Sequence, residues 1–303
     1  MKNIFIAALI IISIAACSEE QLPVETVSYD KIIRGGTIHD GLGSAGVIGD
    51  VAINGDRIVA VGDLGTATGT EEIDASGLVV SPGFVNMLSH SMRNLIHDPR
   101  GMSELKQGVT MEIFGEGTSM GPLNEQMRQA QTEQQGDIKF DISWTTLGDY
   151  LSFMEDKGIS PNIASFIGAT TARINEIGYE NRLPTEEELV RMQQLVIDAM
   201  NEGALGVGSS LIYAPASYSD TNELVALNKA ASVCGGSYIS HLRSEGNLVD
   251  EAIDELITIA READIPAEIY HLKAAGKDNW DKMDPIIERI EQARADNTVA
   301  HAP

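Results

Sequence analysis

Two short, largely apolar runs that each end on a histidine constrain the fold most. The first leads through residues 237–240 to His241, and the second leads through residues 267–270 to His271. A charged loop and a helical segment ending near residue 263 lie between them. The histidines are 30 residues apart, about the length of one strand–helix unit of a parallel α/β fold. Parallel neighbouring strands would place both imidazoles side by side at one edge of the sheet.

Paired histidines at such an edge favour a metal site. In an α/β barrel, the carboxyl ends of the strands form the active-site face. Zinc commonly takes two histidines and a carboxylate, and it keeps one position open for water. The sequence therefore predicts one zinc ion per chain, held by His241 and His271. The alternative is that either histidine caps its strand with a hydrogen bond; the matched pair favours the ligand interpretation.

The amino-terminal residues predict export. After a short basic start, residues 4–14 form an apolar run broken only by Ser13, which is too short to span a membrane. The run ends in small residues followed by Cys17, as a cleaved secretory signal does. This end resembles a bacterial lipobox, which implies a signal peptide at 1–16, lipidation of Cys17 and a tether at 17–28. We expect a lipoprotein anchored by acyl chains, periplasm-facing or at the outer membrane; the alternative is an ordinary signal peptide with an incidental cysteine.

The composition fits an exported globular enzyme. The chain has 303 residues, 43% of them hydrophobic, which is enough for one large domain and a small one. Its net charge of −24 argues against nucleic acid and against polybasic contact with a membrane. The other cysteine is Cys234, so a lipidated Cys17 leaves no disulfide within the chain. Cys234 ends a predicted helix, and we expect it to be buried.

The pattern of apolar residues divides the chain into a small β domain and a larger α/β domain. Residues 29–81 read as strands and turns, with a hairpin at Asn54-Gly55, because this dipeptide supplies the positive φ angles of a tight turn. Residues 82–303 alternate strands and helices. Before the two histidine strands, the expected strands are 84–88, 109–115, 163–168 and 204–209.

The helices between these strands are marked by caps and apolar faces. Thr185 and Glu188 form a capping box at the start of one helix. Three apolar faces are predicted to pack in the core: Leu189, Met192, Leu195, Val196 and Ala199; Leu248, Ala252, Ile253, Leu256 and Ile259; and Met283, Ile286, Ile287 and Ile290.

Several motifs, in this order and spacing, resemble the amidohydrolase superfamily, and among its branches the N-acyl-D-amino-acid deacylases, or D-aminoacylases. They are GGTIHDG at 35–41, SPGFVNMLSH at 81–90, QGVT at 107–110, SLIYAP at 210–215, YISHLRSE at 238–245 and YHLKAAG at 270–276. The resemblance implies an α/β barrel with a small β-sandwich, zinc, and hydrolysis of the amide of an N-acyl-D-amino acid. It also implies that His241 and His271 are the tightly held zinc ligands and that Lys273 and Tyr213 lie near the substrate.

Arg243 is a further candidate for substrate binding. With Glu245, it is spaced to orient the loop after His241 or to support the metal ligands. The alternatives are an exposed Arg243–Glu245 pair and, for Lys273, a solvated loop lysine.

The chain departs from the family pattern at two ligand positions. The first strand usually ends His-x-His, but here the places are Leu88-Ser89-His90, so a second metal is not expected. His90 is a candidate ligand, a substrate contact or a plain loop histidine. Gly117 stands where D-aminoacylases have a metal-bridging cysteine, and Glu116 is the candidate third ligand. The alternative for Glu116 is a loop carboxylate held by backbone amides.

The fold expected is therefore α/β: an incomplete TIM-type (β/α) barrel of about six of eight units, preceded by a small β-sandwich domain. The sequence ends at Pro303, where a seventh barrel strand would begin, and the family's catalytic aspartate is expected beyond it. We therefore expect little deacylase activity from residues 1–303 alone. Two other functions remain open: another amidohydrolase specificity, for a cyclic amide or a dipeptide, or a non-catalytic metal-binding surface lipoprotein.

Overall fold

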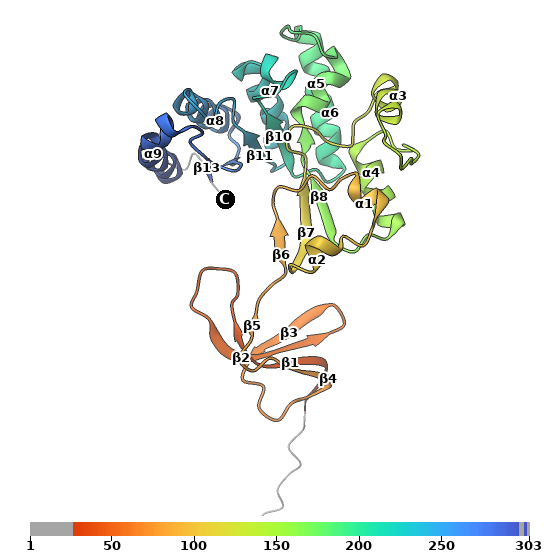
Figure 1. Cartoon of the computed structure of the whole chain (residues 1–303), viewed down its shortest axis with the longest axis vertical. Coiled ribbons are helices and arrows are strands. Elements are labelled where there is room, and N and C mark those ends of the chain that lie inside the picture. Colours follow the sequence, from red (N-terminus) through yellow and green to blue (C-terminus); the bar gives the residue numbers. More distant parts are fainter. Residues whose placement is uncertain (1–26, 297–299, 302–303) are drawn as a thin grey trace, which may run out of the picture. The chain divides into compact units, whose positions relative to one another are not determined.

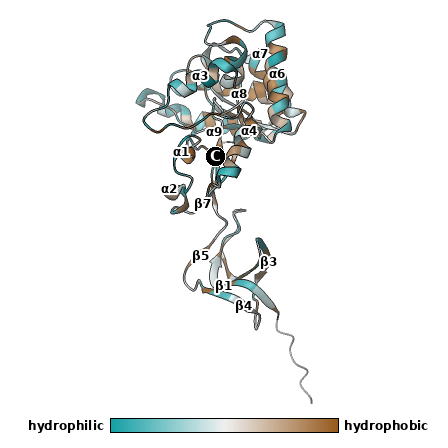
Figure 2. Ribbon diagram, turned by 90° about the vertical axis from the view of Figure 1, so that its right-hand side faces the viewer, coloured by the Kyte–Doolittle hydropathy of each residue, from teal (hydrophilic) through white to brown (hydrophobic). Residues whose placement is uncertain are grey.

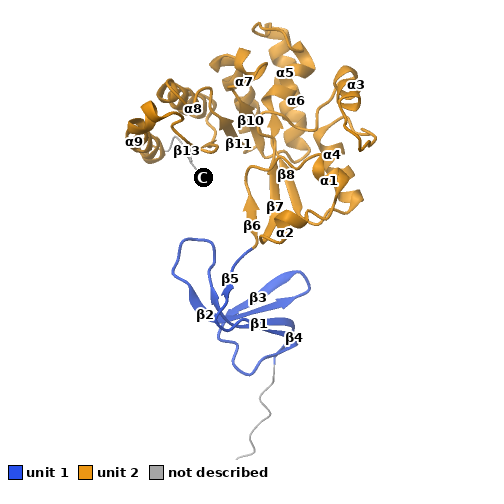
Figure 3. Cartoon of the chain, viewed as in Figure 1, with its two compact units in different colours: residues 1–82 blue, residues 83–303 orange. Residues whose placement is uncertain are grey.

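A computed structural model of the protein describes residues 27–296 and 300–301. The chain divides into two compact units, Met1–Pro82 and Gly83–Pro303 (Figure 3). The expected signal peptide, Cys17 and nearly all of the tether lie outside the described residues. Across the residues described, no helix combines the length and apolar character needed to cross a membrane.

The first unit is a five-stranded sheet. Its strands are β1 (Ser28–Ile38), β2 (Val47–Asn54), β3 (Arg57–Gly62), β4 (Thr68–Asp74) and β5 (Val79–Val80). They run in the order β3-β2-β1-β4, and β5 also pairs with β1. The pairs β1–β2 and β2–β3 are antiparallel, whereas β4 and β5 lie parallel to β1. The hairpin predicted at Asn54-Gly55 is confirmed, because Gly55 joins β2 to β3 with a φ of 57°.

The second unit is built on parallel strands that follow the order of the sequence (Figure 1). One sheet has the order β6-β7-β8 and the other the order β13-β12-β11-β10-β9. The strands are β6 (Phe84–Asn86), β7 (Val109–Phe114), β8 (Asn162–Ser165), β9 (Ile167–Gly168), β10 (Gly206–Ser210), β11 (Ser237–His241), β12 (Ala267–Ile269) and β13 (Ala300–His301). The expected strand 163–168 is divided into β8 and β9, which belong to different sheets. Among the described residues, no pairing joins β6 to β13.

Helices connect successive strands of this unit. They are α1 (Asn94–His97), α2 (Met102–Leu105), α3 (Glu125–Glu133), α4 (Leu147–Lys157), α5 (Ala169–Ile177), α6 (Glu186–Asn201), α7 (Thr221–Ser232), α8 (Val249–Ala263) and α9 (Met283–Ala295), with short 3₁₀ turns η1 (Ala216–Tyr218) and η2 (Lys277–Lys282). The capping box of Thr185 and Glu188 is confirmed at the start of α6. Figure 2 shows polar and apolar stretches on these helices, as amphipathic packing requires.

Three sequence predictions about burial are wrong. Leu248 stands just before α8 instead of on its apolar face, and it is 59% exposed. Ile287 of α9 is also exposed, although its neighbours Ile286 and Ile290 are buried. Cys234 is exposed because it follows the end of α7, in the turn that leads to Gly235. Leu248 and Cys234 lie beside the ends of helices, and Ile287 lies at the edge of an apolar face. At such positions the periodicity of the sequence does not predict burial reliably.

The core of the second unit has an inner and an outer part. Ile113, Phe166, Ile239 and Tyr270 pack together as one cluster, while Val207 and Tyr238 belong to the larger cluster between strands and helices. Neighbours such as Tyr238 and Ile239 enter different clusters because successive side chains of a strand point to opposite faces. The two clusters hold the strands on both faces and so fix where their carboxyl ends lie.

A buried ion pair ties α5 to α7. Arg173 and Glu223 have side chains that are 0% and 1% exposed, and their Nη1 and Oε2 atoms are 2.5 Å apart. The Arg173 guanidinium also donates to the carbonyl oxygens of Glu180 and Arg182. Glu223 accepts a second hydrogen bond from the Ser219 hydroxyl at 2.9 Å. These contacts compensate part of the cost of removing two charges from water.

Candidate metal centre

Three side chains from the carboxyl ends of different strands form the candidate site. His241 is the last residue of β11, and His271 follows β12. Glu116 lies in the loop after β7. Because β11 and β12 are parallel neighbours, their two histidines meet at one edge of the sheet, as their spacing predicted.

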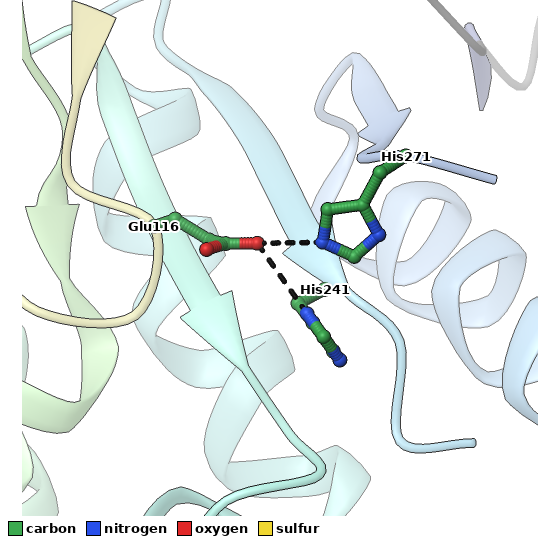
Figure 4. A group of neighbouring side chains, drawn as sticks. All are labelled: Glu116, His241 and His271. Carbon is green, nitrogen blue, oxygen red and sulfur yellow. Dashed lines mark hydrogen bonds and ion pairs between the residues drawn. The ribbon is translucent and has the colours of Figure 1, made fainter. Parts of the chain in front are cut away.

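The carboxylate of Glu116 faces both imidazole rings from one side (Figure 4). Its Oε1 atom lies 2.9 Å from Nε2 of His271 and 3.5 Å from Nδ1 of His241. The ring centroids of the histidines are 4.4 Å apart. One potential ligand atom from each residue lies within 4.8 Å of the other two, a separation that a single ion can bridge.

The three side chains are largely removed from solvent. Glu116 and His241 have side chains that are 8% and 9% exposed, and His271 is 26% exposed. Burial lowers the pKa of His241, which favours the neutral imidazole that binds metals. The Nε2 atom of His241 is buried and has no hydrogen-bond partner among the described residues. Nδ1 of His241 faces Glu116, and two imidazole nitrogens with one carboxylate oxygen are a donor set that fits a zinc ion.

Two glycines set the path of the loop that presents Glu116. Gly115 and Gly117 have φ angles of 104° and 75°, which side-chain-bearing residues rarely adopt. A Cβ atom on Gly117 would lie 2.5 Å from the Ser210 hydroxyl oxygen. The cysteine that the resemblance would place at position 117 would therefore collide with Ser210. Glu116, one residue earlier, supplies the carboxylate instead.

His271 adopts a strained backbone conformation. Its φ of 43° is one of two positive values among the non-glycine residues that the structure describes. Such angles cost of order 1–3 kcal/mol and persist where the surroundings hold them. Here the ring is held from both sides, by Glu116 at Nε2 and by Glu245 at Nδ1, each at 2.9 Å.

Glu245 and Lys273 form the layer behind the histidines. Oε1 of Glu245 contacts the Lys273 amine and lies 3.7 Å from Nε2 of His241. The Lys273 amine is also 2.8 Å from Nδ1 of His271. The sequence assigned Lys273 to the substrate, and the structure places it in an ion pair with Glu245, half exposed. The sequence left Glu245 to orient the His241 loop, to support the metal ligands or to form an exposed pair with Arg243; the structure adds its contact with His271, which no local pattern predicts.

The remaining predicted residues lie around this group. His90 has its Nε2 atom 3.5 Å from the second oxygen of Glu116, and its side chain is 68% exposed. Tyr213 is exposed, with its ring 5.2 Å from the His241 ring. Both residues are therefore accessible beside the candidate metal ligands.

Arg243, for which the sequence left several roles open, is held by groups of α8 and of the segment after β10. Its guanidinium donates to both carboxylate oxygens of Glu255 on α8, at 2.8 and 2.9 Å. It also donates to the carbonyl oxygens of Ser217 and Ser219, at 3.2 and 2.9 Å. These contacts use most of the donors of a guanidinium. We therefore assign Arg243 to holding the β10–α7 connection against α8 instead of to the substrate.

Comparison with known proteins gives relatives that include deacylases of N-acyl-D-amino acids. The chain is 32% identical over 276 residues to D-aminoacylase from Alcaligenes xylosoxydans xylosoxydans, covering 90% of this chain and 56% of that protein. It is 31% identical over 272 residues to N-acyl-D-aspartate deacylase from the same organism, covering 89% and 54%. No protein-family model matches the chain.

Solved structures of deacylases of the same kind also superpose on this chain. A crystal structure of D-aminoacylase, described as defining a subset of amidohydrolases, superposes with a TM-score of 0.81 at 31% identity, covering 90% of this chain and 58% of that one. N-acyl-D-glutamate deacylase from Bordetella bronchiseptica, solved with zinc and a phosphonate inhibitor, gives a TM-score of 0.82 at 26% identity, covering 91% and 58%.

The fold and its relatives thus define an amidohydrolase-type α/β protein. More narrowly, the chain is a homologue of the D-aminoacylases and the N-acyl-D-aspartate and N-acyl-D-glutamate deacylases. It spans little more than half the length of these relatives, 54–56%.

Proposed function

We propose that this chain belongs to a metal-dependent hydrolase that cleaves the amide bond of N-acyl-D-amino acids. The observation that carries the proposal is the meeting of Glu116, His241 and His271, whose ligand atoms lie within 4.8 Å of one another. Homology to deacylases supplies the substrate class, and the site supplies the chemistry that such a reaction needs. The partner is therefore a small N-acyl amino acid, with no nucleic acid involved.

Each residue of the site has a distinct task in this proposal. Two neutral imidazoles and one carboxylate would hold a zinc ion and leave a position open. When bound, the metal supplies Lewis-acid polarisation of the amide carbonyl and activation of water. Glu245 fixes the orientation of His271 through Nδ1, an arrangement common behind metal-binding histidines. We propose that Tyr213 and His90 contact the substrate; the support is that both are exposed beside the candidate ligands.

We propose one zinc ion per chain. Among the described residues, one group offers three metal-binding side chains within reach of each other. One D-aminoacylase structure, with a TM-score of 0.83 at 32% identity, concerns a binuclear metal centre activated by one metal and attenuated by a second. In this chain, Leu88 and Gly117 stand at two of the family's ligand positions, which supports the single-metal arrangement.

The finer architecture is part of the proposal. We infer that the parallel strands from β6 to β13 are an incomplete TIM-type barrel, because they pair in sequence order as barrel strands do. We also infer that the sheet of the first unit is part of a β-sandwich. A crystal structure of the chimaera described next would test both statements.

The activity is tested with a chimaera. The zinc-loaded chain is assayed alone and fused to the carboxyl-terminal part of a D-aminoacylase, against N-acetyl-D-amino acids, their L-enantiomers, hydantoins and isoaspartyl dipeptides. We expect the fused form to hydrolyse the N-acetyl-D-amino acids, and a His241→Ala chimaera to be inactive. A folded, zinc-bound chimaera that hydrolyses only a cyclic amide or a dipeptide would contradict the proposed substrate class.

We also propose that the protein is exported and anchored to the membrane by acyl chains on Cys17. The support is the apolar run at residues 4–14 and the small residues directly before the cysteine. A Cys17→Ala form is expected to lose the membrane fraction, because acyl chains and not a spanning helix would provide the anchor. Cell fractionation and mass spectrometry of the mature amino terminus measure this. A variant that is processed and fractionates like the parent would disprove lipidation.

A further inference from the structure

A cavity of about 400 Å³ lies beside the candidate metal centre. It is enclosed by the loop after β6, the loop after β7, and helices α3 and α5. Its walls include His90, Met92, Arg93, Met120, Gln131 and Tyr179. Such a volume lies in the range of small-molecule sites, which are mostly apolar with a few polar groups that orient the ligand.

The cavity lies close to the metal centre, because two of its lining residues contact Glu116. His90 lines the cavity, and its Nε2 atom is 3.5 Å from the Glu116 carboxylate. Thr118 also lines it, and its backbone N–H donates to the carbonyl oxygen of Glu116 at 2.9 Å. A substrate whose amide lies at the three ligands can therefore extend one of its other groups into this cavity.

The chemistry of the walls favours an anion. The chain has 45 acidic and 21 basic residues, yet no aspartate or glutamate lines this cavity. In contrast, the larger cavity beside α4 is lined by Asp149, Glu155 and Glu202. A negatively charged ligand therefore meets no repelling carboxylate in the walls of the cavity themselves.

Arg93 is the cation of this wall. In the described part of the chain, its guanidinium takes part in no hydrogen bond or ion pair, whereas Arg100 pairs with Asp98 and Arg128 with Glu125. It is half-buried, so part of its charge is removed from water without a protein partner. A guanidinium presents a planar pair of donors that matches a carboxylate. Arg93 is therefore ready to pair with an anionic group that enters the cavity.

We propose that this cavity is a substrate subsite in which Arg93 binds a carboxylate of the N-acyl amino acid. The inference rests on the proposed function for the substrate class and adds the residue that recognises its charge. Two sources of the carboxylate share this chemistry: the α-carboxylate, present in every substrate, and the side-chain carboxylate of an N-acyl-D-aspartate or N-acyl-D-glutamate. The isosteric pair N-acetyl-D-glutamate and N-acetyl-D-glutamine separates them, because only the first has a charged side chain.

Calorimetry measures the binding of both compounds to the parent chain and to Arg93→Gln, Arg93→Lys and Arg100→Gln variants, with and without zinc. Arg93→Gln is expected to weaken binding by about 10- to 100-fold, since hydrogen bonds between charged groups are worth about 1.5–3 kcal/mol. Arg93→Lys should recover part of the affinity through its charge. Arg100→Gln removes the same charge outside the cavity and should bind as the parent does.

A loss confined to N-acetyl-D-glutamate identifies the side-chain carboxylate, and an equal loss for both compounds identifies the α-carboxylate. Three results would overturn the inference: unchanged binding to Arg93→Gln, an equal loss with Arg100→Gln, or no binding of either compound to the parent chain. If instead the proposed function is wrong, the protein takes up no zinc. Elemental analysis measures zinc uptake separately from ligand binding.

Discussion

Replacing His241 or His271 with alanine is expected to abolish zinc binding by a protein that otherwise stays folded. Each change removes one of three candidate ligands whose atoms lie within 4.8 Å of one another, and we expect the two remaining groups to hold the ion too weakly. The loss of affinity should exceed the roughly 10- to 100-fold typical of residues behind the ligands. Elemental analysis of the purified variants, supported by calorimetric titration with zinc, measures the result.

Matched variants show whether the effect belongs to the site. His39→Ala removes an exposed histidine of the first unit and should leave zinc content unchanged. Glu245→Gln keeps the shape of the side chain that contacts His271 and should weaken zinc binding within the 10- to 100-fold range. Full zinc content in both His241→Ala and His271→Ala would rule out the metal centre. Full zinc content in the Glu116→Ala variant alone would show only that Glu116 is not a ligand.

Replacing Arg173 with leucine is expected to lower the free energy of unfolding by about 3–5 kcal/mol. The reason is that Glu223 would keep its buried carboxylate without the guanidinium that neutralises it. Urea unfolding followed by circular dichroism measures the change, because the pair lies between α5 and α7 and its loss should shift the midpoint of the second unit.

The double variant Arg173→Leu/Glu223→Leu removes both charges and should recover most of the loss, since an apolar pair carries no desolvation cost. Arg191→Leu breaks an exposed ion pair with Glu176 and should cost no more than about 1 kcal/mol. A single Arg173→Leu variant that loses less than the Arg191→Leu control would show that the buried pair contributes little.

Local patterns were sufficient to predict most of the elements. The Asn54-Gly55 hairpin follows from the backbone angles that its two residues tolerate, and the capping box at Thr185 follows from groups three residues apart. The repeat of strand and helix brought His241 and His271 to one edge, because parallel neighbours align their ends. Predictions of burial failed at the ends of helices, as Leu248 and Cys234 show. At these positions the periodicity of apolar residues fixes neither the burial of a side chain nor the limit of the helix.

The sequence by itself determined the strand order, the amphipathic helices and the paired histidines, because all depend on residues within one or two elements. The sequence named Glu116 as a candidate and left a loop carboxylate as the alternative; only the tertiary structure brings its carboxylate beside both histidines. Glu116 lies 155 positions before His271, and its approach depends on two glycines and on the packing of three strands. The same is true of Lys273, which pairs with Glu245, and of Arg243, which is held by Glu255. A charged side chain selects its partner from everything that packing brings within a few ångströms, and this selection is not encoded in any local pattern.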